Sequence, residues 1–229
     1  MPGTITTGFA TTAKAEMMEA GHCFNATVTP TGTTVSGAQT VTGISSMAGI
    51  VVGMGITGGN LSAGAVVETI SGSNSITVSR LASAASAGAT FTIVGDSFKI
   101  ALIKSANTGN YSASNVNYTD LTGNSDEVAS GGGYTTTGVL LTNTTATTNG
   151  TGANINFNNP SWTSATFSTT GAIIYNTSQR IGGVTGTNSS GGGRAVGIYT
   201  FNGVQTVTTG TFTVTMPAAA PATAILALQ

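Results

Sequence analysis

The amino-acid sequence predicts an all-β protein with one short helix near its N-terminus. Thr and Val occur throughout in short runs, and β-branched residues of this kind favour strands. Clusters of Gly, Asn and Ser separate the runs and supply the residues that turns require. A helical composition occurs only in residues 11–22, so the rest of the chain is expected to form short strands joined by turns.

The N-terminal region combines an extended arm with the predicted helix. Residues 1–10 are rich in Thr and are expected to be extended. The segment TTAKAEMMEAGH, residues 11–22, contains good helix formers, and Gly21 provides a stop signal. One apolar stripe has i, i+4 spacing: Phe9, Ala13, Met17 and then Ala20 or Phe24. Such a stripe indicates that the helix docks on another surface.

Residues 28–95 predict a small all-β module. Five short strand runs follow one another at intervals of 8–15 residues: TTVSGAQTVTGI, GIVVGMGITG, GAVVETISGS, NSITVSRLAS and ATFTIVGD. Glu68 and Arg80 are the only charged residues between positions 28 and 95. The regular spacing and the turn residues between the runs are typical of a compact β unit.

Gly53, Gly55 and Gly58 of this module match the G-x-G-x-x-G pattern of dinucleotide-binding turns. That function needs a helix directly after the glycines, because the helix N-terminus holds the pyrophosphate. The residues that follow have strand-like alternation and no helical period. We therefore interpret these glycines as turn, bulge and close-packing positions, and we expect no cofactor.

Residues 96–229 predict a jelly-roll-like β-sandwich. The run DSFKIALIKS alternates, with Phe98, Ile100 and Leu102 on one side, and predicts a half-buried strand. A polar loop follows at 106–133, and a Gly/Ser/Asn loop is expected at 182–193. The further strand runs are YTTTGVLLTNTTATTN, ANINFNNPSW, SATFSTTGAIIYN, RAVGIYTFNG, QTVTTGTFTVTMP and TAILALQ. About eight strands without a helix is the number that a jelly roll contains.

Charged residues are scarce. The chain has six basic and seven acidic residues, or 6% of its length, against a norm of about 25%. A surface with so few charges tolerates close contact with copies of itself or with a partner, because contact buries no unpaired ions. This composition indicates a component of a large assembly, with a secreted, weakly charged β protein as the alternative.

The same composition argues against several classes of function. Six scattered basic residues cannot form a track that neutralises phosphates, so no nucleic-acid partner is expected. The most apolar run, residues 47–56, is too short for a membrane span, and the N-terminus lacks the pattern of a secretory signal. Cys23 is the only cysteine, which excludes an intrachain disulfide and a thiolate metal site.

No catalytic set can be assembled from the sequence. His22 is the only histidine and adjoins Cys23 at the expected helix end, where neighbouring side chains point apart. We interpret His22 as a capping or packing residue and Cys23 as a small buried apolar residue. The carboxylates outside the 120–127 segment do not form the pair that a glycosidase needs.

The segment DLTGNSDE, residues 120–127, offers alternate oxygen ligands of the kind that bind Ca²⁺. Asp120, Asn124 and Asp126 are the candidate ligands. The glycine and the terminal glutamate of the EF-hand register are missing, and no helices flank the segment. A polar connecting loop is therefore the default interpretation, and a calcium site is the alternative.

The C-terminal part of the chain resembles a widespread family of tailed-bacteriophage virion proteins. The resemblance is carried by DSFKIALIKS, YTDLTGNSDEV, GYTTTGVLL, FNNPSWTSATFSTTGAIIYN, GGRAVGIYTFNG and GTFTVTMPA, all between residues 96 and 229. In that family a helix similar to TTAKAEMMEAGHCF runs almost directly into FKIAL. The resemblance implies an arm and helix at 1–27 that pack with the C-terminal domain, an inserted β module at 28–95, and a virion domain at 96–229.

The family implies a non-enzymatic structural component of the virion, assembled in the cytoplasm of the bacterial host. The expected role is a capsid decoration or cement protein that stabilises the head shell. A neck, tail or fibre-base protein is the alternative, and a carbohydrate-binding adhesin module is a more distant one. The expected partners are copies of the chain itself, as a homo-oligomer, and other virion proteins such as the major capsid protein. The expected contact residues are Ile5, Phe9, Met17 and Phe24.

Overall fold

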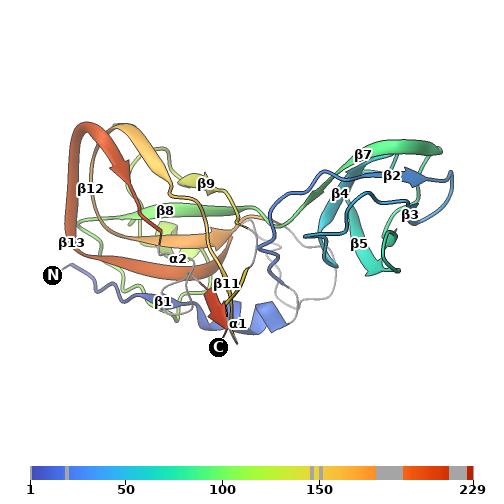
Figure 1. Ribbon diagram of the computed structural model, residues 1–229. Helices are drawn as coiled ribbons and strands as arrows, with labels where there is room; N and C mark the ends of the chain where they lie inside the picture. Colours follow the sequence, from blue (N-terminus) through green and yellow to red (C-terminus); the bar gives the residue numbers. More distant parts are fainter. Residues whose placement is uncertain are drawn as a thin grey trace. The chain divides into compact units, whose positions relative to one another are not determined.

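The computed structural model describes residues 2–18, 21–144, 147–149, 152–178, 193–216 and 226–228 (Figure 1). The chain divides into two compact units. Unit 1 comprises Met1–His22, Ser97–Thr142 and Ala146–Gln229, and unit 2 comprises Cys23–Asp96 with Asn143–Thr145. Strands make up most of the described elements, so the all-β prediction is confirmed. The insertion of a module at 28–95 into a parent domain stays a prediction.

Unit 2 contains a closed six-stranded barrel. Its strands are β2 (Thr31–Thr34), β3 (Thr40–Thr42), β4 (Gly55–Gly58), β5 (Ala65–Ile70), β6 (Ile76–Val78) and β7 (Ser86–Val94). They pair antiparallel in the order β2-β3-β6-β5-β4-β7, and β7 closes the barrel by pairing with both β2 and β4. Closure lets both edges of the sheet find hydrogen-bond partners within the unit.

Alternating residues of these strands fill the barrel. Ile76 and Val78 are buried on β6, and Phe91 and Ile93 are buried on β7, while the residues between them are more exposed. The same core contains Val41, Met54, Ile56, Val67 and Cys23. Because successive side chains of a strand point to opposite faces, this period of two is what made the strands predictable.

The G-x-G-x-x-G stretch lies in the turn before β4 and in β4 itself. Gly53 has a φ of +89° and Gly58 a φ of +109°, in the left-handed region that favours glycine. At Gly59 a Cβ atom would lie 2.4 Å from the ring of Phe91, so the missing side chain makes room for the core. The chain then continues into β5 and not into a helix. The interpretation as turn and close-packing positions is confirmed for Gly53 and Gly58, whereas Gly55 is a regularly paired residue of β4.

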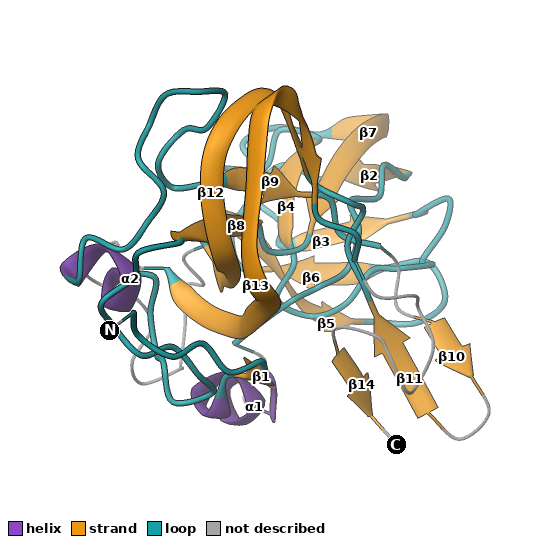
Figure 2. Cartoon of the chain, turned by 90° about the vertical axis from the view of Figure 1, so that its left-hand side faces the viewer, coloured by secondary structure: helices purple, strands orange, loops and turns teal. Residues whose placement is uncertain are grey.

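Unit 1 is built on a five-stranded antiparallel sheet with the order β1-β13-β12-β8-β9 (Figure 2). Its strands are β1 (Gly8–Phe9), β8 (Phe98–Lys104), β9 (Val139–Leu141), β12 (Ser161–Asn176) and β13 (Arg194–Thr213). A three-stranded sheet contains β10 (Thr147–Asn149), β11 (Gly152–Ile155) and β14 (Leu226–Leu228), in the order β10-β11-β14. The described strands of unit 1 thus group as five and three, and the jelly-roll arrangement stays a prediction. The loop expected at 182–193 lies outside the described residues except for Gly193.

Strand β8 is more buried than its sequence predicts. Phe98, Ile100 and Leu102 are buried as expected, but Ala101 and Ile103 on the opposite face are buried too. The strand lies between β12 and β9, and its second face packs in a core cluster with residues of the loop that follows it. The prediction of a half-buried strand is therefore wrong, because alternation cannot reveal a polar-looking loop that covers the second face.

Strands β12 and β13 form a long two-stranded ribbon that continues beyond the end of β8 (Figures 1 and 2). The pairing of β8 with β12 stops at Thr169, whereas β13 stays paired with β12 as far as Ser161. Ser164, Asn202 and Thr209 have positive φ values at irregularities of this pairing. The sequence predicts two separate strands in the region of β13, RAVGIYTFNG and QTVTTGTFTVTMP. The structure contains one strand there, with a bulge near Asn202.

Helix α2 (Thr119–Gly123) lies in the segment that was expected to be a loop without a helix. That expectation is wrong, because a helix of 5 residues is too short to show a helical period in the sequence. Leu121 is its buried residue and belongs to the core cluster of unit 1.

The N-terminal arm docks on unit 1 through main-chain hydrogen bonds. β1 pairs with β13 at Gly197 and Ile198. On its other side the arm exchanges hydrogen bonds with Tyr111, whose N–H donates to the Thr4 carbonyl and whose carbonyl accepts from Thr6 N–H. The arm is therefore an extra strand segment held between the sheet and the loop after β8.

Helix α1 (Thr11–Met18) follows the arm directly. Ala13 on its buried face has no exposed surface. The helix expected at 11–22 is described as far as Met18, and the Gly21 N–H donates to the Glu16 carbonyl over 2.6 Å. A hydrogen bond that reaches back over five residues is typical of a glycine that ends a helix.

Candidate functional site

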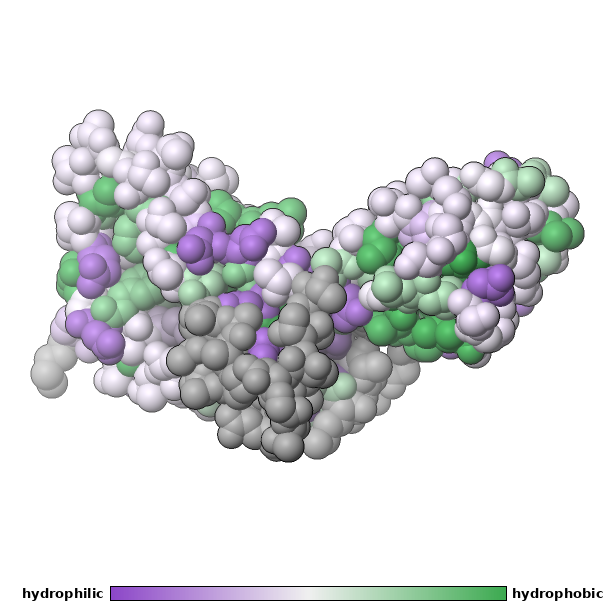
Figure 3. Space-filling view, viewed as in Figure 1, coloured by the Kyte–Doolittle hydropathy of each residue, from purple (hydrophilic) through white to green (hydrophobic). Residues whose placement is uncertain are grey.

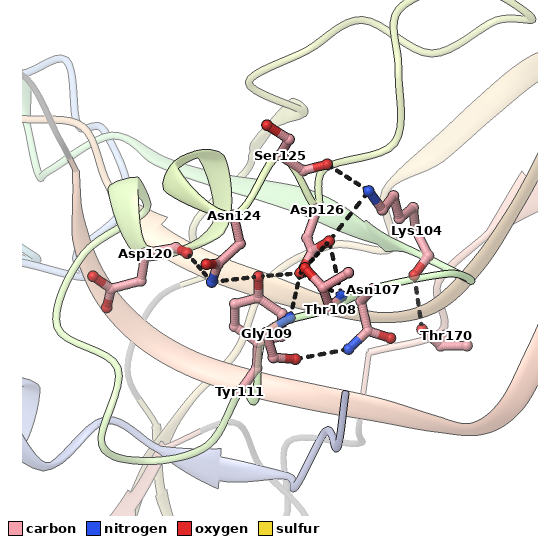
Figure 4. A network of polar contacts seen from close by, with 10 residues as sticks. All are labelled: Lys104, Asn107, Thr108, Gly109, Tyr111, Asp120, Asn124, Ser125, Asp126 and Thr170. Carbon is pink, nitrogen blue, oxygen red and sulfur yellow. Dashed lines mark hydrogen bonds and ion pairs between the residues drawn. The ribbon is translucent and has the colours of Figure 1, made fainter. Parts of the chain in front are cut away.

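The loop between β8 and β9 is organised around the carboxylate of Asp126 (Figure 4). Asp126 has no exposed surface and accepts hydrogen bonds from the backbone N–H groups of Thr108 at 2.9 Å and Gly109 at 2.7 Å. The Tyr111 hydroxyl donates a further bond of 2.7 Å, and the Lys104 ammonium lies 3.2 Å from Oδ1. The Asp126 carboxylate therefore joins its own part of the loop to the end of β8 at Lys104 and to the start of the loop at residues 108–111.

The electrostatics of this network keep Asp126 ionised. Burial raises the pKa of the carboxyl, but hydrogen bonds from Gly109, Tyr111 and Thr108, together with Lys104, outweigh it and hold the pKa below its usual value. Burial raises the pKa of the Tyr111 hydroxyl, so Tyr111 remains a neutral donor. The arrangement is a buried anion whose oxygens face protein donors.

The three residues considered as calcium ligands do not turn their oxygens toward one point. Asp120 accepts hydrogen bonds from the backbone N–H groups of Val116 and Asn117, and its carboxylate points away from Asp126 in Figure 4. Asn124 approaches the Asp120 carbonyl with its amide nitrogen at 3.0 Å. Within the described residues, no group of three or more His, Cys, Asp or Glu side chains could hold a metal ion. The geometry supports a polar connecting loop.

Glu127 fastens the later part of the same loop. Its carboxylate accepts hydrogen bonds from the hydroxyl groups of Tyr118 and Tyr134 and from the N–H of Thr137, the last two at 2.7 Å. The Tyr118 ring stacks on Tyr175 of β12 with 4.4 Å between centroids. The two adjacent carboxylates at 126 and 127 thus hold a long polar segment in a fixed conformation on the sheet.

Another buried carboxylate, Glu16, lies on α1. Its Oε2 is 2.7 Å from Nε2 of His22, and its Oε1 is 2.8 Å from the guanidinium of Arg194. The Asn176 amide nitrogen lies 2.9 Å from the other His22 ring nitrogen. His22 is therefore a buried packing residue that joins α1 to the end of β12, while Glu16 joins α1 to Arg194 at the start of β13. Cys23 is buried in the barrel core, as the sequence predicts.

These networks leave few charges on the described surface. Among the charged residues that the structure describes, only Lys14, Glu68 and Arg80 are exposed. Residues 128–179 and 195–229 contain no charged residue, so Arg194 is the only charge on β12 and β13. Figure 3 shows the result on one face: residues of intermediate hydropathy dominate, and hydrophilic ones are scattered among them.

The β12–β13 ribbon is the candidate functional site, as a neutral surface for assembly. Most of β13 from Asn202 onward is exposed, and Val204 keeps 57% of its surface in solvent. Aromatic rings of both strands pack on one another: Trp162 lies 5.8 Å from Phe212, and Phe212 lies 5.3 Å from Phe167, between ring centroids. This packing stiffens the ribbon, and Trp162 is a buried part of it, with 3% of its surface exposed.

The contact residues predicted from the sequence do not lie on this ribbon. Ile5 and Phe9 are partly buried against the core of unit 1. Met17 is half-buried, and Phe24 is buried. Within one chain these side chains contribute to packing, and their role in contacts between copies stays a prediction. The signal that could have found the ribbon is the long charge-free run after Arg194.

Comparisons with protein-family models, with curated proteins and with solved structures returned no match for this chain. The resemblance to phage virion proteins therefore depends on the sequence motifs and stays a prediction. In the described part of the chain, no helix has the length and apolar character needed to cross a membrane.

Proposed function

We propose that this protein is a non-enzymatic structural component of a tailed-bacteriophage virion, and specifically a capsid decoration or cement protein. The placement of charge is the observation that supports this proposal most. Glu16, Asp96 and Asp126 are buried, and the described surface has few exposed charges. A free soluble domain usually keeps a heavily charged surface, whereas a subunit that contacts neighbours on several sides does not need one.

The virion class comes from the motif resemblance between residues 96 and 229, and the fold is compatible with it. The quoted motifs correspond to β8, the loop around Asp126 and Glu127, β12 and β13. These are the elements that carry the central sheet and the neutral ribbon. We further propose that they belong to a jelly-roll-like virion domain, into which the barrel of unit 2 is inserted as a second β module.

The abundance of the protein in virions tests the proposed role. Particles of the phage whose genome encodes this chain are purified, and the ratio of the chain to the major capsid protein is measured by quantitative mass spectrometry. A ratio of the same order as one supports a decoration protein. A few copies per particle would support the alternative, a neck, tail or fibre-base protein. Absence from the particle would overturn the virion assignment.

The attachment chemistry gives a second test. The purified full-length chain is bound to particles from which it has been stripped, across a series of increasing salt concentrations. Contacts made by neutral side chains and backbone groups should change little in affinity, because screening acts on charges. A steep loss of binding with salt would contradict attachment through a neutral surface.

A further inference from the structure

The outer edge of β13 is only partly paired. Its inner edge bonds to β12 along the ribbon. On its outer edge, β1 pairs with Gly197 and Ile198, and the Thr200 N–H donates to Thr7 Oγ1 over 3.0 Å. Beyond Thr200, none of the strands that the structure describes lies on this edge. Within the described residues, the strand therefore begins beside the N-terminal arm and continues without an outer neighbour.

The unpaired edge contains one regular segment, residues 204–208, with the sequence VQTVT. Positive φ values bound it on both sides, at Asn202 and Gly203 before it and at Thr209 after it. Between these points Gln205, Thr206 and Val207 pair with successive residues of β12 without a register shift. Five residues is an ordinary length for a strand, so this segment can support a ladder of its own.

This edge lacks most of the features that normally prevent strand pairing between proteins. Exposed edges are usually blocked by Lys or other charged side chains, by Pro, or by a covering element. Residues 195–216 contain no charged residue and no Pro. Val204 is 57% exposed, and Gln205, Thr206 and Thr208 are exposed as well. The bulges at Asn202 and Thr209 limit the pairing to the segment between them, and the segment itself stays available.

We infer that residues 204–208 pair antiparallel with the same residues of a second copy of this chain, about a twofold axis at Thr206. An antiparallel ladder of a strand with itself is isologous, so one neutral surface supplies both halves. A second copy meets no like charge here, whereas a charged partner strand would gain no ion pair. In this register Thr206 faces Thr206 of the other copy, and Val204 faces Thr208.

This inference rests on the proposed function, because only assembly on a particle brings copies of the chain to the concentration at which such a short ladder forms. A five-residue ladder alone buries too little surface for a tight dimer. Copies fixed side by side on a particle meet at an effective concentration on the order of millimolar, where a weak contact is populated. The role of the ladder is then to join neighbouring decoration subunits to one another.

Cysteine cross-linking tests the pairing on the full chain, in a Cys23→Ser background. Thr206→Cys places the two thiols on residues whose Cα atoms lie about 5 Å apart, within disulfide range. The matched control is Ser168→Cys. Ser168 lies on the inner strand, β12, and its hydroxyl is 2.8 Å from the hydroxyl of Thr206. Its copies would be separated by three strand spacings, about 14 Å, and cannot join. Rising protein concentration should give a covalent dimer from Thr206→Cys and none from Ser168→Cys.

A charge exchange tests the register. The variant Val204→Lys with Thr208→Lys places lysines opposite each other and should abolish cross-linking through Thr206→Cys. The variant Val204→Lys with Thr208→Glu places Lys opposite Glu across the ladder and should restore it. No cross-link from Thr206→Cys, equal cross-links from Ser168→Cys, or equal behaviour of the two charge variants would overturn the inference. Mass spectrometry of virions separates this result from the proposed function, because a chain that is abundant on particles but does not cross-link disproves only the ladder.

Discussion

The two units differ in where their charged side chains lie. In unit 2 the barrel core is apolar, and Glu68 and Arg80 are exposed, while the buried Asp96 at the end of the unit accepts a hydrogen bond from the Cys23 N–H. In unit 1 the ion pairs are inside: Glu16 contacts His22 and Arg194, and Lys104 contacts the fully buried Asp126. The longest connection between barrel strands is residues 43–54, whereas unit 1 must fix the much longer loop between Lys104 and Val139, and helix α1, on its sheet. The comparison suggests that the buried charges serve to hold these irregular segments.

Spectroscopy can separate the two units. Trp162 and all five tyrosines lie in unit 1, so tryptophan and tyrosine fluorescence reports on that unit. Hydrogen exchange of peptides from residues 31–94 reports on the barrel.

Phe91→Ala should destabilise the barrel by about 3–5 kcal/mol, because it removes a large side chain from a closed apolar core. Phe91 is 1% exposed, and its ring lies against Gly59, where a Cβ atom would come within 2.4 Å of it. Hydrogen exchange in residues 31–94 should accelerate strongly, while the Trp162 fluorescence transition in denaturant stays in place. The matched change Phe98→Ala in unit 1 should have the reverse pattern. An equal shift of both signals in both variants would show that the units unfold as one.

Asp126→Asn should destabilise unit 1 by about 2–4 kcal/mol at neutral pH, since it removes a buried charge and turns an amide toward backbone N–H donors. The folded-state pKa of Asp126 is lowered, so its contribution is complete above the unfolded pKa of about 3.9 and is lost as the pH falls through the folded value. The gap between the native protein and the variant, measured by Trp162 fluorescence in denaturant, should therefore close in acid.

Lys104→Met is the control for this prediction. The Lys104 side chain is 34% exposed, so solvent screens its attraction to Asp126 and the loss should be about 1 kcal/mol or less. A loss as large as that of Asp126→Asn would mean that the ion pair, and not the hydrogen bonds from Thr108, Gly109 and Tyr111, holds the loop. A gap that stays open in acid would contradict the lowered pKa.

The sequence predicted the strands of the barrel because their signals are local. The runs that contain β5 and β6 alternate, and glycines and serines mark the turns between them. Closure of the barrel was not predictable, because β7 pairs with both β2 and β4 and no local pattern encodes such distant pairs. The bulge that keeps β13 a single strand at Asn202 was missed for a related reason: Asn and Gly read as a turn in sequence.

The network around Asp126 was harder to predict than the fold. The sequence drew attention to Asp126 as a possible cation ligand, and the residue is indeed central to its loop. Its partners lie 15 to 22 positions earlier in the chain, and nothing in the spacing shows that the loop folds back on itself. Composition could predict that charges are few, but only the structure shows that Lys14, Glu68 and Arg80 alone among the described ones are exposed.

The smallest effect on stability is expected from removal of Glu68 and Arg80, the exposed charges of unit 2. Glu68→Gln with Arg80→Gln removes both, and the stability of the barrel should change by less than about 0.5 kcal/mol, because neither side chain has an ion-pair partner in the described structure. Hydrogen exchange of residues 31–94 should be unaltered, and it should also be the same at low and high salt. A barrel that folds equally well without these charges depends on apolar packing and main-chain pairing. A clear loss of protection in the double variant, or a salt dependence that the variant abolishes, would show that long-range attraction between Glu68 and Arg80 contributes to the stability of the barrel. Charged side chains would then stabilise both units and not unit 1 alone.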